Sequence, residues 1–236
     1  MYKHLQNGSD IRGVAIKTAD KEITLTSEIV KRIGAALVKH LEKKLGKSDL
    51  KIALGHDSRL SATDMFLCIA SGIEHKGAKA VYTGLSSTPA MFFSTILDKH
   101  NYDAGVMITA SHLPYERNGF KFFTKEGGFE KDDIKTILKY AEEFDGAGIP
   151  TKAMSDFEQS DIMGDYAKEL QKIIKDKAGL GEKPLTDLHI IIDAGNGAGG
   201  YFEKLVLQPL GAKTTGSLFT EPDGTFPNHS PNPEDS

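Results

Sequence analysis

A hydroxyl, an imidazole and fixed cations stand close together in one short segment of this chain. Ser111 and His112 are adjacent, Arg117 and Asn118 follow a few residues later, and Lys121 comes next. Phosphoryl transfer needs such groups, because its catalysis consists mostly of positioning the moving group and neutralising its charge. The segment therefore makes Ser111 a candidate for handling an anionic group.

The residues of this segment alone leave two alternatives to that role. Ser111 and Asn118 could satisfy the backbone of a polar loop, as such residues commonly do in turns. A serine hydrolase is disfavoured, because adjacent side chains at a strand end tend to diverge and hydrolase triads take their histidine from a distant segment. Thr109 and Ala110 also precede the serine, so the G-x-S-x-G turn of many hydrolases is absent.

Four motifs, in order along the chain, resemble one enzyme family. The segment 109–112 (Thr-Ala-Ser-His), followed by 118–121 (Asn-Gly-Phe-Lys), resembles the active-serine loop of the α-D-phosphohexomutases of the phosphomannomutase/phosphoglucomutase type. Residues 10–13 resemble the family's D-I-R-G element, whose arginine reaches the active site. Residues 55–59 resemble its G-x-D-x-R element, and residues 193–200 resemble the turn that opens its second domain.

The resemblance implies a phosphoserine enzyme that interconverts hexose 1-phosphate and hexose 6-phosphate through a hexose 1,6-bisphosphate. It makes Ser111 the phosphoryl carrier, with Arg12, His112 and Lys121 as the cations or proton-transfer groups around it. Substrate contacts are expected from Arg12, Ser111, Asn118 and Lys121. It also implies Mg²⁺, bound by the phosphate on Ser111 and by the aspartates of a D-G-D-x-D-R motif, which this chain lacks.

Several of these motifs could also serve a purely structural role. Arg12 could form a surface ion pair with Asp10, and Lys121 could be a solvated strand position. Arg59 is expected to brace a loop internally through Asp57, and the glycines at 195–200 are expected to make a tight turn rather than a dinucleotide site.

One residue departs from the pattern of many relatives. Leu113 stands where they have Asn, directly after the serine-histidine pair. The sequence therefore leaves open whether the hexose is glucose, mannose or an amino sugar.

Short apolar runs alternate with helical patterns along the first 150 residues. Strands are expected at 51–55, 79–83, 104–109 and 119–124, and helices at 26–45, 62–75, 89–97 and 131–144. The link 110–118 is too short for a parallel crossover. The sequence therefore predicts an α/β fold with a mixed β-sheet sandwiched between helices.

A turn-rich segment at 145–150 predicts a boundary between a domain at 1–150, which bears the active-serine loop, and a partial second α/β domain of similar type at 151–236. The second domain is expected to hold helices at 161–177 and 201–207 and strands at 188–193 and 213–218. Residues 221–233 are rich in Pro, Asn and Asp, which favours a linker or tail.

The second domain has too few strands to be complete, so we expect a fragment that is inactive alone. The alternative is a short non-catalytic relative that binds a sugar phosphate or a partner. An uncovered strand edge and an apolar helix face in this domain would favour a dimer or disorder there.

Composition narrows the possible partners. The net charge of −4 comes from 29 basic and 33 acidic residues that are intermixed, so no basic field for nucleic acid is expected. No stretch approaches the roughly 18 apolar residues of a membrane span, and no signal peptide is evident, so we expect a cytoplasmic location. The one cysteine, Cys68, is expected to be a small buried apolar residue.

Overall fold

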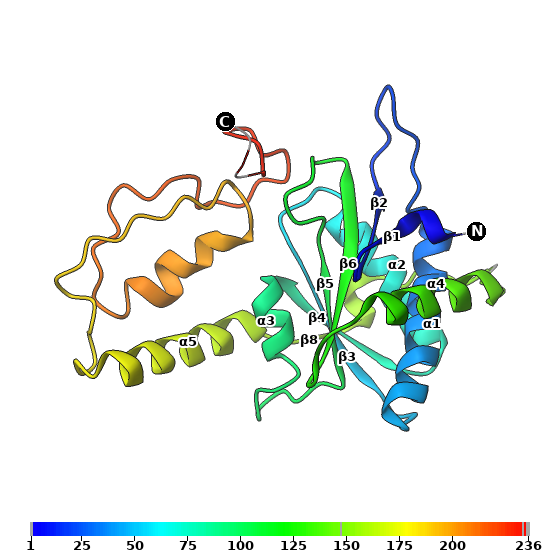
Figure 1. Cartoon of the computed structure of the whole chain (residues 1–236), viewed down its shortest axis with the longest axis horizontal. Helices are drawn as coiled ribbons and strands as arrows, with labels where there is room; N and C mark the ends of the chain where they lie inside the picture. The colour runs from blue at the N-terminus through cyan, green and yellow to red at the C-terminus, as the bar shows by residue number, and fades with distance from the viewer. Residues whose placement is uncertain (1, 147, 233, 235–236) are drawn as a thin grey trace.

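A computed structural model describes residues 2–146, 148–232 and 234. It has a large unit built on one β-sheet and a smaller lobe that extends to one side (Figure 1). The strands of the sheet follow the order β1-β2-β6-β5-β3-β4-β8, and β7 pairs with β6. Their bounds are β1 Gln6–Asn7, β2 Asp10–Val14, β3 Lys51–His56, β4 Lys79–Leu85, β5 Ala104–Ile108, β6 Arg117–Thr124, β7 Gly127–Gly128 and β8 Glu158–Gln159.

The sheet is mixed, as the short link between two of its strands predicts. β3 is parallel to β4 and β5, whereas β6 is antiparallel to β5 and to β2. Only the loop 109–116 joins β5 to β6, which is too short for a crossover between parallel strands. The strands β1, β2, β7 and β8 were not predicted from the sequence.

Helices cover both faces of this sheet. α1 (Ser27–Leu45), α2 (Ala62–His75) and α4 (Lys131–Glu143) share a hydrophobic core with Ile52 and Val106, while α3 (Thr88–Phe93) and α5 (Ile162–Ala178) share a second core with Ala53 and Met107. Adjacent residues of β3 and β5 thus enter opposite cores, as the alternation of side chains along a strand requires. The predicted helix–sheet–helix sandwich is confirmed.

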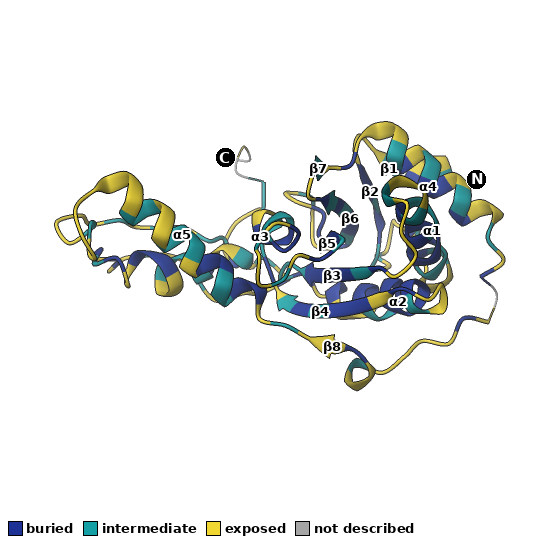
Figure 2. Cartoon of the chain, turned by 90° about the horizontal axis from the view of Figure 1, so that it is seen from below, coloured by how far each residue is buried: buried dark blue, intermediate teal, exposed yellow. Residues whose placement is uncertain are grey.

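Burial is concentrated in this unit (Figure 2). The inner strands β3 and β4 and the inward faces of α1 and α2 are buried, whereas much of the smaller lobe is exposed. Cys68 lies in α2 with 4% of its surface exposed, and burial raises the pKa of its thiol. The prediction of a small buried cysteine is confirmed.

Local signals set the ends of α1. The Thr26 hydroxyl oxygen accepts a hydrogen bond from the Ile29 amide, and Gly46 ends the helix at a φ of 63°. A glycine reaches this left-handed conformation without a side-chain clash, which explains the stop there. The predicted helix at 26–45 therefore has the right extent.

The predicted helix at 89–97 is too long. α3 ends at Phe93, after which the hydroxyls of Ser94 and Thr95 donate to the carbonyl oxygens of Met91 and Phe92. Side chains that bond to nearby backbone in this way compete with continued helix.

The smaller lobe holds α5, the short helical turns η3 (Ala198–Gly200) and η4 (Glu203–Leu207), and two extended segments. The predicted strands at 188–193 and 213–218 lie side by side and parallel, but only isolated bridges, His189 to Lys213 and Asp193 to Leu218, join them. The prediction of two regular strands is therefore wrong. Each segment pairs only with the other among the described residues, and isolated bridges are too few to make a continuous β-ladder.

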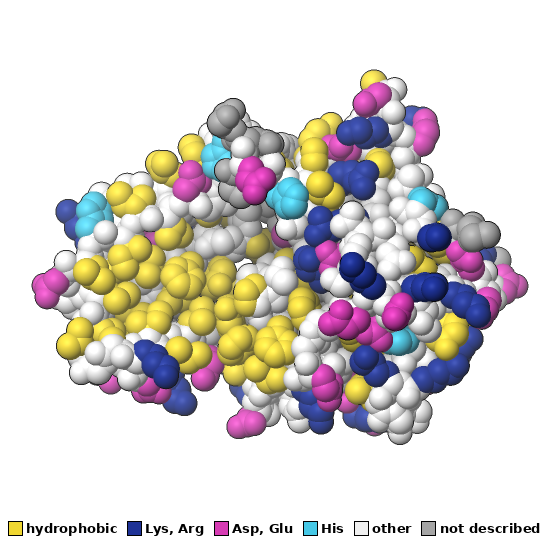
Figure 3. Space-filling view, viewed as in Figure 1, with side chains coloured by type: hydrophobic (Ala, Val, Ile, Leu, Met, Phe, Trp, Pro, Cys, Tyr) yellow, Lys and Arg dark blue, Asp and Glu magenta, His cyan; other side chains and the backbone are white. Residues whose placement is uncertain are grey.

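The lobe exposes large apolar side chains. Figure 3 shows hydrophobic groups gathered over it, and Leu180, Leu188, Ile191, Leu205 and Leu218 are all exposed.

The predicted division into domains 1–150 and 151–236 stays a prediction. β8 (158–159) pairs with β4, so the sheet of the large unit takes up residues beyond 150. Ala147 of the predicted boundary and Pro233 at the end of the predicted tail lie outside the described residues.

Close contact between α1 and α2 yields a test of the packing. An alanine methyl at Gly34 would lie 2.2 Å from the Ile69 carbonyl oxygen, so the helices would have to separate. Gly34→Ala is expected to lower the free energy of unfolding by about 2 kcal/mol despite its better helix propensity. Urea denaturation followed by circular dichroism measures the change.

Gly128→Ala is the matched control, because its added methyl would lie 3.7 Å from the Phe123 ring, an ordinary contact. It should change the free energy of unfolding by less than about 0.5 kcal/mol. Equal stabilities of the two variants would refute the proposed tight crossing.

Candidate functional site

Ser111 lies at the carboxyl end of β5 in an unusual backbone conformation. Its φ is 60°, which is uncommon for a residue with a side chain, and its surface is exposed. The Ser111 amide donates to the Thr109 hydroxyl at 2.9 Å, and that hydroxyl donates to the Asp57 carboxylate at 2.6 Å. The hydroxyl group of Ser111 is thus presented at the sheet edge where open α/β folds gather their ligands.

The buried guanidinium of Arg59 holds the loop that carries Ser111. Its Nη2 donates to the carbonyl oxygens of Ser111 and Leu113 at 2.8 and 2.6 Å. Its Nη1 donates to those of Pro114 and Arg117 at 2.7 and 3.0 Å. The fifth N–H, on Nε, donates to Asp57 at 3.1 Å. Every donor of the guanidinium is therefore satisfied by the protein.

The predicted bracing role of Arg59 and Asp57 agrees with these contacts. The side chain of Arg59 has 0% of its surface exposed, and its backbone amide also donates to the Asp57 carboxylate. Burial lowers the pKa of the Arg59 guanidinium, and the charge of Asp57 opposes that shift. The pair fixes the backbone from residue 111 to residue 117.

Arg12 and Lys121 are brought together by one carboxylate. They lie on the antiparallel neighbours β2 and β6, where Asp10 accepts from Arg12 Nη2 at 2.8 Å and from Lys121 Nζ at 2.5 Å. Arg12 Nη1 also donates to the carbonyl oxygen of Ala110 at 3.3 Å, next to Ser111. The ion pair between Arg12 and Asp10 exists, but the side chains are only 11% and 10% exposed, so it is not a surface pair.

Asn118 occupies a different environment from the other predicted site residues. It is fully buried, its amide nitrogen donates to the Ser61 hydroxyl at 2.8 Å, and its amide oxygen accepts from the Gly119 amide at 2.8 Å. Its side chain does not line the pocket beside Ser111. These bonds fix the start of β6, and a contact between Asn118 and a substrate stays a prediction.

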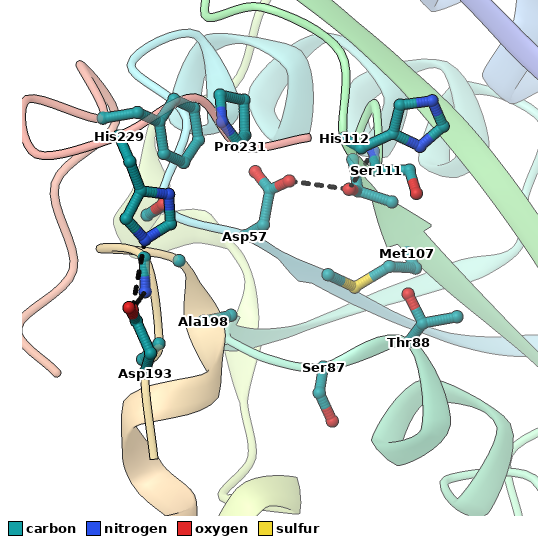
Figure 4. Close-up of a pocket in the computed structure, with 16 residues that line it drawn as sticks. Asp57, Ser87, Thr88, Met107, Ser111, His112, Asp193, Ala198, His229 and Pro231 are labelled. Carbon is teal, nitrogen blue, oxygen red and sulfur yellow. Dashed lines mark hydrogen bonds and ion pairs between the residues drawn. The ribbon is translucent and has the colours of Figure 1, made fainter. Parts of the chain in front are cut away.

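A pocket of about 530 Å³ opens beside Ser111, between the two parts of the chain. Figure 4 shows Ser111 and His112 on one side of it and Asp193, Ala198 and His229 on the other. Arg12 and Lys121 are not among the described residues that line it. The arrangement suits a ligand that contacts both the serine loop, residues 109–116, and the glycine turn, residues 193–197.

The segment 221–233 was expected to be a linker or tail, and that prediction is wrong for the described part of the segment, residues 221–232. Gly224 packs so closely on the backbone of residues 58–60 that an added methyl would lie 2.4 Å from the Ser58 carbonyl oxygen. The Phe226 ring centre lies 5.3 Å from the Arg59 guanidinium carbon. Composition alone could not reveal these contacts, although Phe226 and His229 are unusual in such a polar segment.

The glycine turn at 193–197 anchors this segment. Gly195 and Asn196 have φ values of 52° and 58°. The amide of the Asn196 side chain donates to the Glu221 carbonyl oxygen at 2.9 Å and its oxygen accepts from the Asn228 side chain at 2.7 Å. These contacts agree with the predicted tight turn.

His229 links the segment to the turn through Asp193. Its Nε2 lies 3.2 Å from the Asp193 carboxylate and its Nδ1 lies 2.8 Å from the Ser230 carbonyl oxygen. The carbonyl of Ser230 and then Asp193 raise the pKa of His229, while the Gly195 amide and then His229 lower the pKa of Asp193. The two shifts favour the charged pair.

Within the described residues, no group of three His, Cys, Asp or Glu side chains is placed to hold a metal ion. The aspartates nearest the pocket have other partners, Arg59 and Thr109 for Asp57 and His229 for Asp193. None of the helices in the described part of the chain has both the length and the apolar character that crossing a membrane requires.

Both parts of the chain match one protein family. Residues 3–146 match the family described as phosphoglucomutase/phosphomannomutase, alpha/beta/alpha domain I, and residues 165–236 match its alpha/beta/alpha domain II.

Individual relatives agree with the family match. A phosphoglucomutase of Neisseria meningitidis is 37% identical, with 95% of this chain and 44% of that protein covered. A phosphoglucosamine mutase of Clostridium kluyveri is 32% identical, with 96% of this chain and 48% of that protein covered.

A crystal structure of a phosphoglucomutase/phosphomannomutase family protein from Burkholderia thailandensis has a TM-score of 0.73 at 27% identity, with 96% of this chain and 46% of that one covered. The chain thus spans about half the length of the curated relatives it matches.

The contacts of Arg59 predict a specific loss on conservative substitution. Arg59→Lys keeps the charge but has three donors in place of five, so carbonyl oxygens of the loop stay unsatisfied. The free energy of unfolding should fall by about 3 kcal/mol, as measured by urea denaturation. Arg32→Lys is the control: the Arg32 side chain is 18% exposed, and the one partner of its guanidinium among the described residues is the exposed carboxylate of Glu28. It should change the free energy of unfolding by less than about 1 kcal/mol; a similarly small effect of Arg59→Lys would exclude the loop-holding role.

The shifted pKa values of His229 and Asp193 predict a pH window for their contact. The raised pKa of His229 means that the contact is fully present below about pH 6.5 and is lost as pH rises through the raised value. The lowered pKa of Asp193 means that it is present above about pH 4 and is lost as pH falls through the lowered value. The contact should therefore be strongest between these limits.

An NMR titration of the His229 imidazole measures this coupling. Asp193→Asn should lower the pKa of His229, while the Ser230 carbonyl contact remains. Asp187→Asn, which changes an exposed aspartate of the same lobe, should leave the His229 titration as it is. An unchanged titration in Asp193→Asn would show that the pair does not form.

Proposed function

Because this chain belongs to the phosphoglucomutase/phosphomannomutase family, we propose that it is the serine-bearing part of a phosphohexomutase that interconverts hexose 1-phosphate and hexose 6-phosphate. In this proposal Ser111 carries the phosphoryl group and a hexose 1,6-bisphosphate is the intermediate. The relatives are named for glucose, mannose and glucosamine phosphates, so the hexose of this protein stays open.

The observation that carries the proposal is the way Ser111 is presented. It is exposed at a φ of 60° on the wall of a pocket, and the backbone around it is held by a fully satisfied buried guanidinium. Non-glycine residues in strained conformations of this kind occur often at active sites, where the surrounding structure holds them in place. A polar loop that served only its own backbone would not need such a hold.

The proposed transfer follows from this position. A hydroxyl oxygen of the hexose monophosphate attacks the phosphorus of phosphorylated Ser111, and the bond from phosphorus to Ser111 Oγ breaks as the new bond forms. His112, on the same wall of the pocket, is our candidate to accept the proton of that hydroxyl. Attack by Ser111 Oγ on the other phosphate of the bisphosphate returns a phosphoryl group to the serine.

Arg12 and Lys121 are our candidates for stabilising the charge on the moving group. Asp10 holds both of them, and Arg12 also contacts the backbone beside Ser111. Preorganised donors of this kind are each worth roughly 3 kcal/mol of transition-state stabilisation. Because neither lines the pocket, we propose that they act on the phosphate at Ser111 rather than on the sugar.

We propose Mg²⁺ as the cofactor of the longer enzyme, with the phosphate on Ser111 as the ligand from this region. Mg²⁺ prefers oxygen ligands from one or two carboxylates, phosphate and water. Since the described residues do not by themselves form a metal site, no step here is derived through the metal. A cytoplasmic location and a dimer through the apolar side chains of the second lobe remain predictions.

The proposal predicts where a phosphate is accepted. After incubation with glucose 1,6-bisphosphate or mannose 1,6-bisphosphate, the longer enzyme should carry one phosphate, which peptide mass spectrometry places on Ser111. Ser111→Ala should abolish the uptake, because the attacking oxygen is gone.

Ser58 and Ser87 also line the pocket, so Ser58→Ala and Ser87→Ala are matched controls that should retain the uptake. Phosphate found on either of these serines, or uptake that persists in Ser111→Ala, would overturn the assignment of the carrier.

A further inference from the structure

We propose that Phe226 is a positioning residue for the Ser111 loop and that it acts through Arg59. The ring centre of Phe226 lies 5.3 Å from the guanidinium carbon, although the two residues belong to different lobes of the chain. This inference rests on the proposed function only in the statement that the positioned loop serves phosphoryl transfer. The positioning itself depends only on the contacts that Phe226 and Arg59 make.

The hydrogen bonds of Arg59 leave only the faces of the guanidinium open. All five N–H groups lie in its plane, and all five have oxygen acceptors: one from Asp57, three from loop carbonyls and one from the carbonyl of Arg117 at the start of β6. A further contact must therefore come from above or below the plane, where an aromatic ring interacts favourably with a cation. Phe226 supplies this contact.

Covering the guanidinium strengthens its hold on the loop. The side chain of Arg59 is 0% exposed, so its hydrogen bonds to the carbonyls do not compete with water. Removal of the ring would open one face to solvent, and water would then compete for the same carbonyl oxygens. The serine loop depends on those bonds along its length, from Ser111 to Arg117.

The backbone of Phe226 is itself strained to make the contact. Its φ is 51°, and a bulky side chain in this region is an outlier that persists only when its surroundings require it. The preceding turn supports it, since Asp223 accepts from the Thr225 and Phe226 amides. The close approach of Gly224 to residues 58–60 then brings the ring over Arg59.

The same segment is tied to the glycine turn of the second lobe. Asn228 bonds to Asn196, and His229 bonds to Asp193. The position of this turn is thus linked through Phe226 and Arg59 to the loop that presents Ser111. In this arrangement the second lobe contributes to the order of the serine loop as well as forming a wall of the pocket.

Amide hydrogen exchange tests the proposal at the loop itself. The amides of Leu113 and Arg117 donate to the carbonyl oxygens of Ala110 and Pro114, so their exchange reports opening of the loop. Phe226→Ala should speed their exchange on the order of tenfold, with the exchange of β3 and β5 unchanged. Phe226→Tyr keeps the ring and should restore slow exchange.

Phe219→Ala is the matched control. Phe219 is also half-buried at a positive φ, but its ring packs on His229 and not on Arg59. It should leave the exchange of Leu113 and Arg117 within about twofold of the unmodified chain.

Three outcomes would overturn the proposal: loop exchange unchanged in Phe226→Ala, exchange faster throughout β3 and β5 as well, or no rescue by Phe226→Tyr. None of these readouts involves phosphate. A failure of Ser111 to accept a phosphate would therefore count against the proposed function and not against the positioning by Phe226.

Discussion

The Arg59 guanidinium carries a charge that is buried completely, and the local structure is arranged to satisfy it. A buried cation is tolerated only when its donors have acceptors, and a guanidinium has five donors in one rigid plane. Asp57 supplies one acceptor, the loop between β5 and β6 supplies three carbonyl oxygens, and Arg117 at the start of β6 supplies a fourth. The loop therefore follows the path that places these carbonyl oxygens around the Arg59 guanidinium.

This constraint explains how an exposed serine can be held in a strained conformation. Ser111 has few contacts of its own beyond the bond from its amide to Thr109. Its carbonyl is bonded to Arg59, and the preceding carbonyl, of Ala110, is bonded to Arg12. Two arginines therefore fix the backbone on both sides of the residue, while its hydroxyl has no hydrogen-bond partner among the described residues.

Carboxylates also order cationic side chains at Asp10 and in the second lobe. The Asp10 carboxylate binds both Arg12 and Lys121 near the serine loop. Its negative charge offsets the repulsion between the two cations. In the second lobe, Asp193 and His229 hold the 221–231 segment beside the glycine turn. Because that segment also contacts Arg59 through Phe226, the loop and the far wall of the pocket belong to one connected network.

Local signals in the sequence determined the helices α1, α2 and α4 and the mixed sheet, and they made Ser111 a candidate site residue. Periodic apolar residues and capping residues act within one element, and the short link 109–116 permits only an antiparallel pair, so neighbouring residues carry this information. The tertiary structure decided the rest. The carbonyls that Arg59 binds lie more than 50 positions away, Asn118 is turned inward toward Ser61, and the polar segment 221–231 packs against residues 58–60. Such contacts form between segments that are far apart in the sequence. No local pattern of composition or spacing shows which of these segments will pack together.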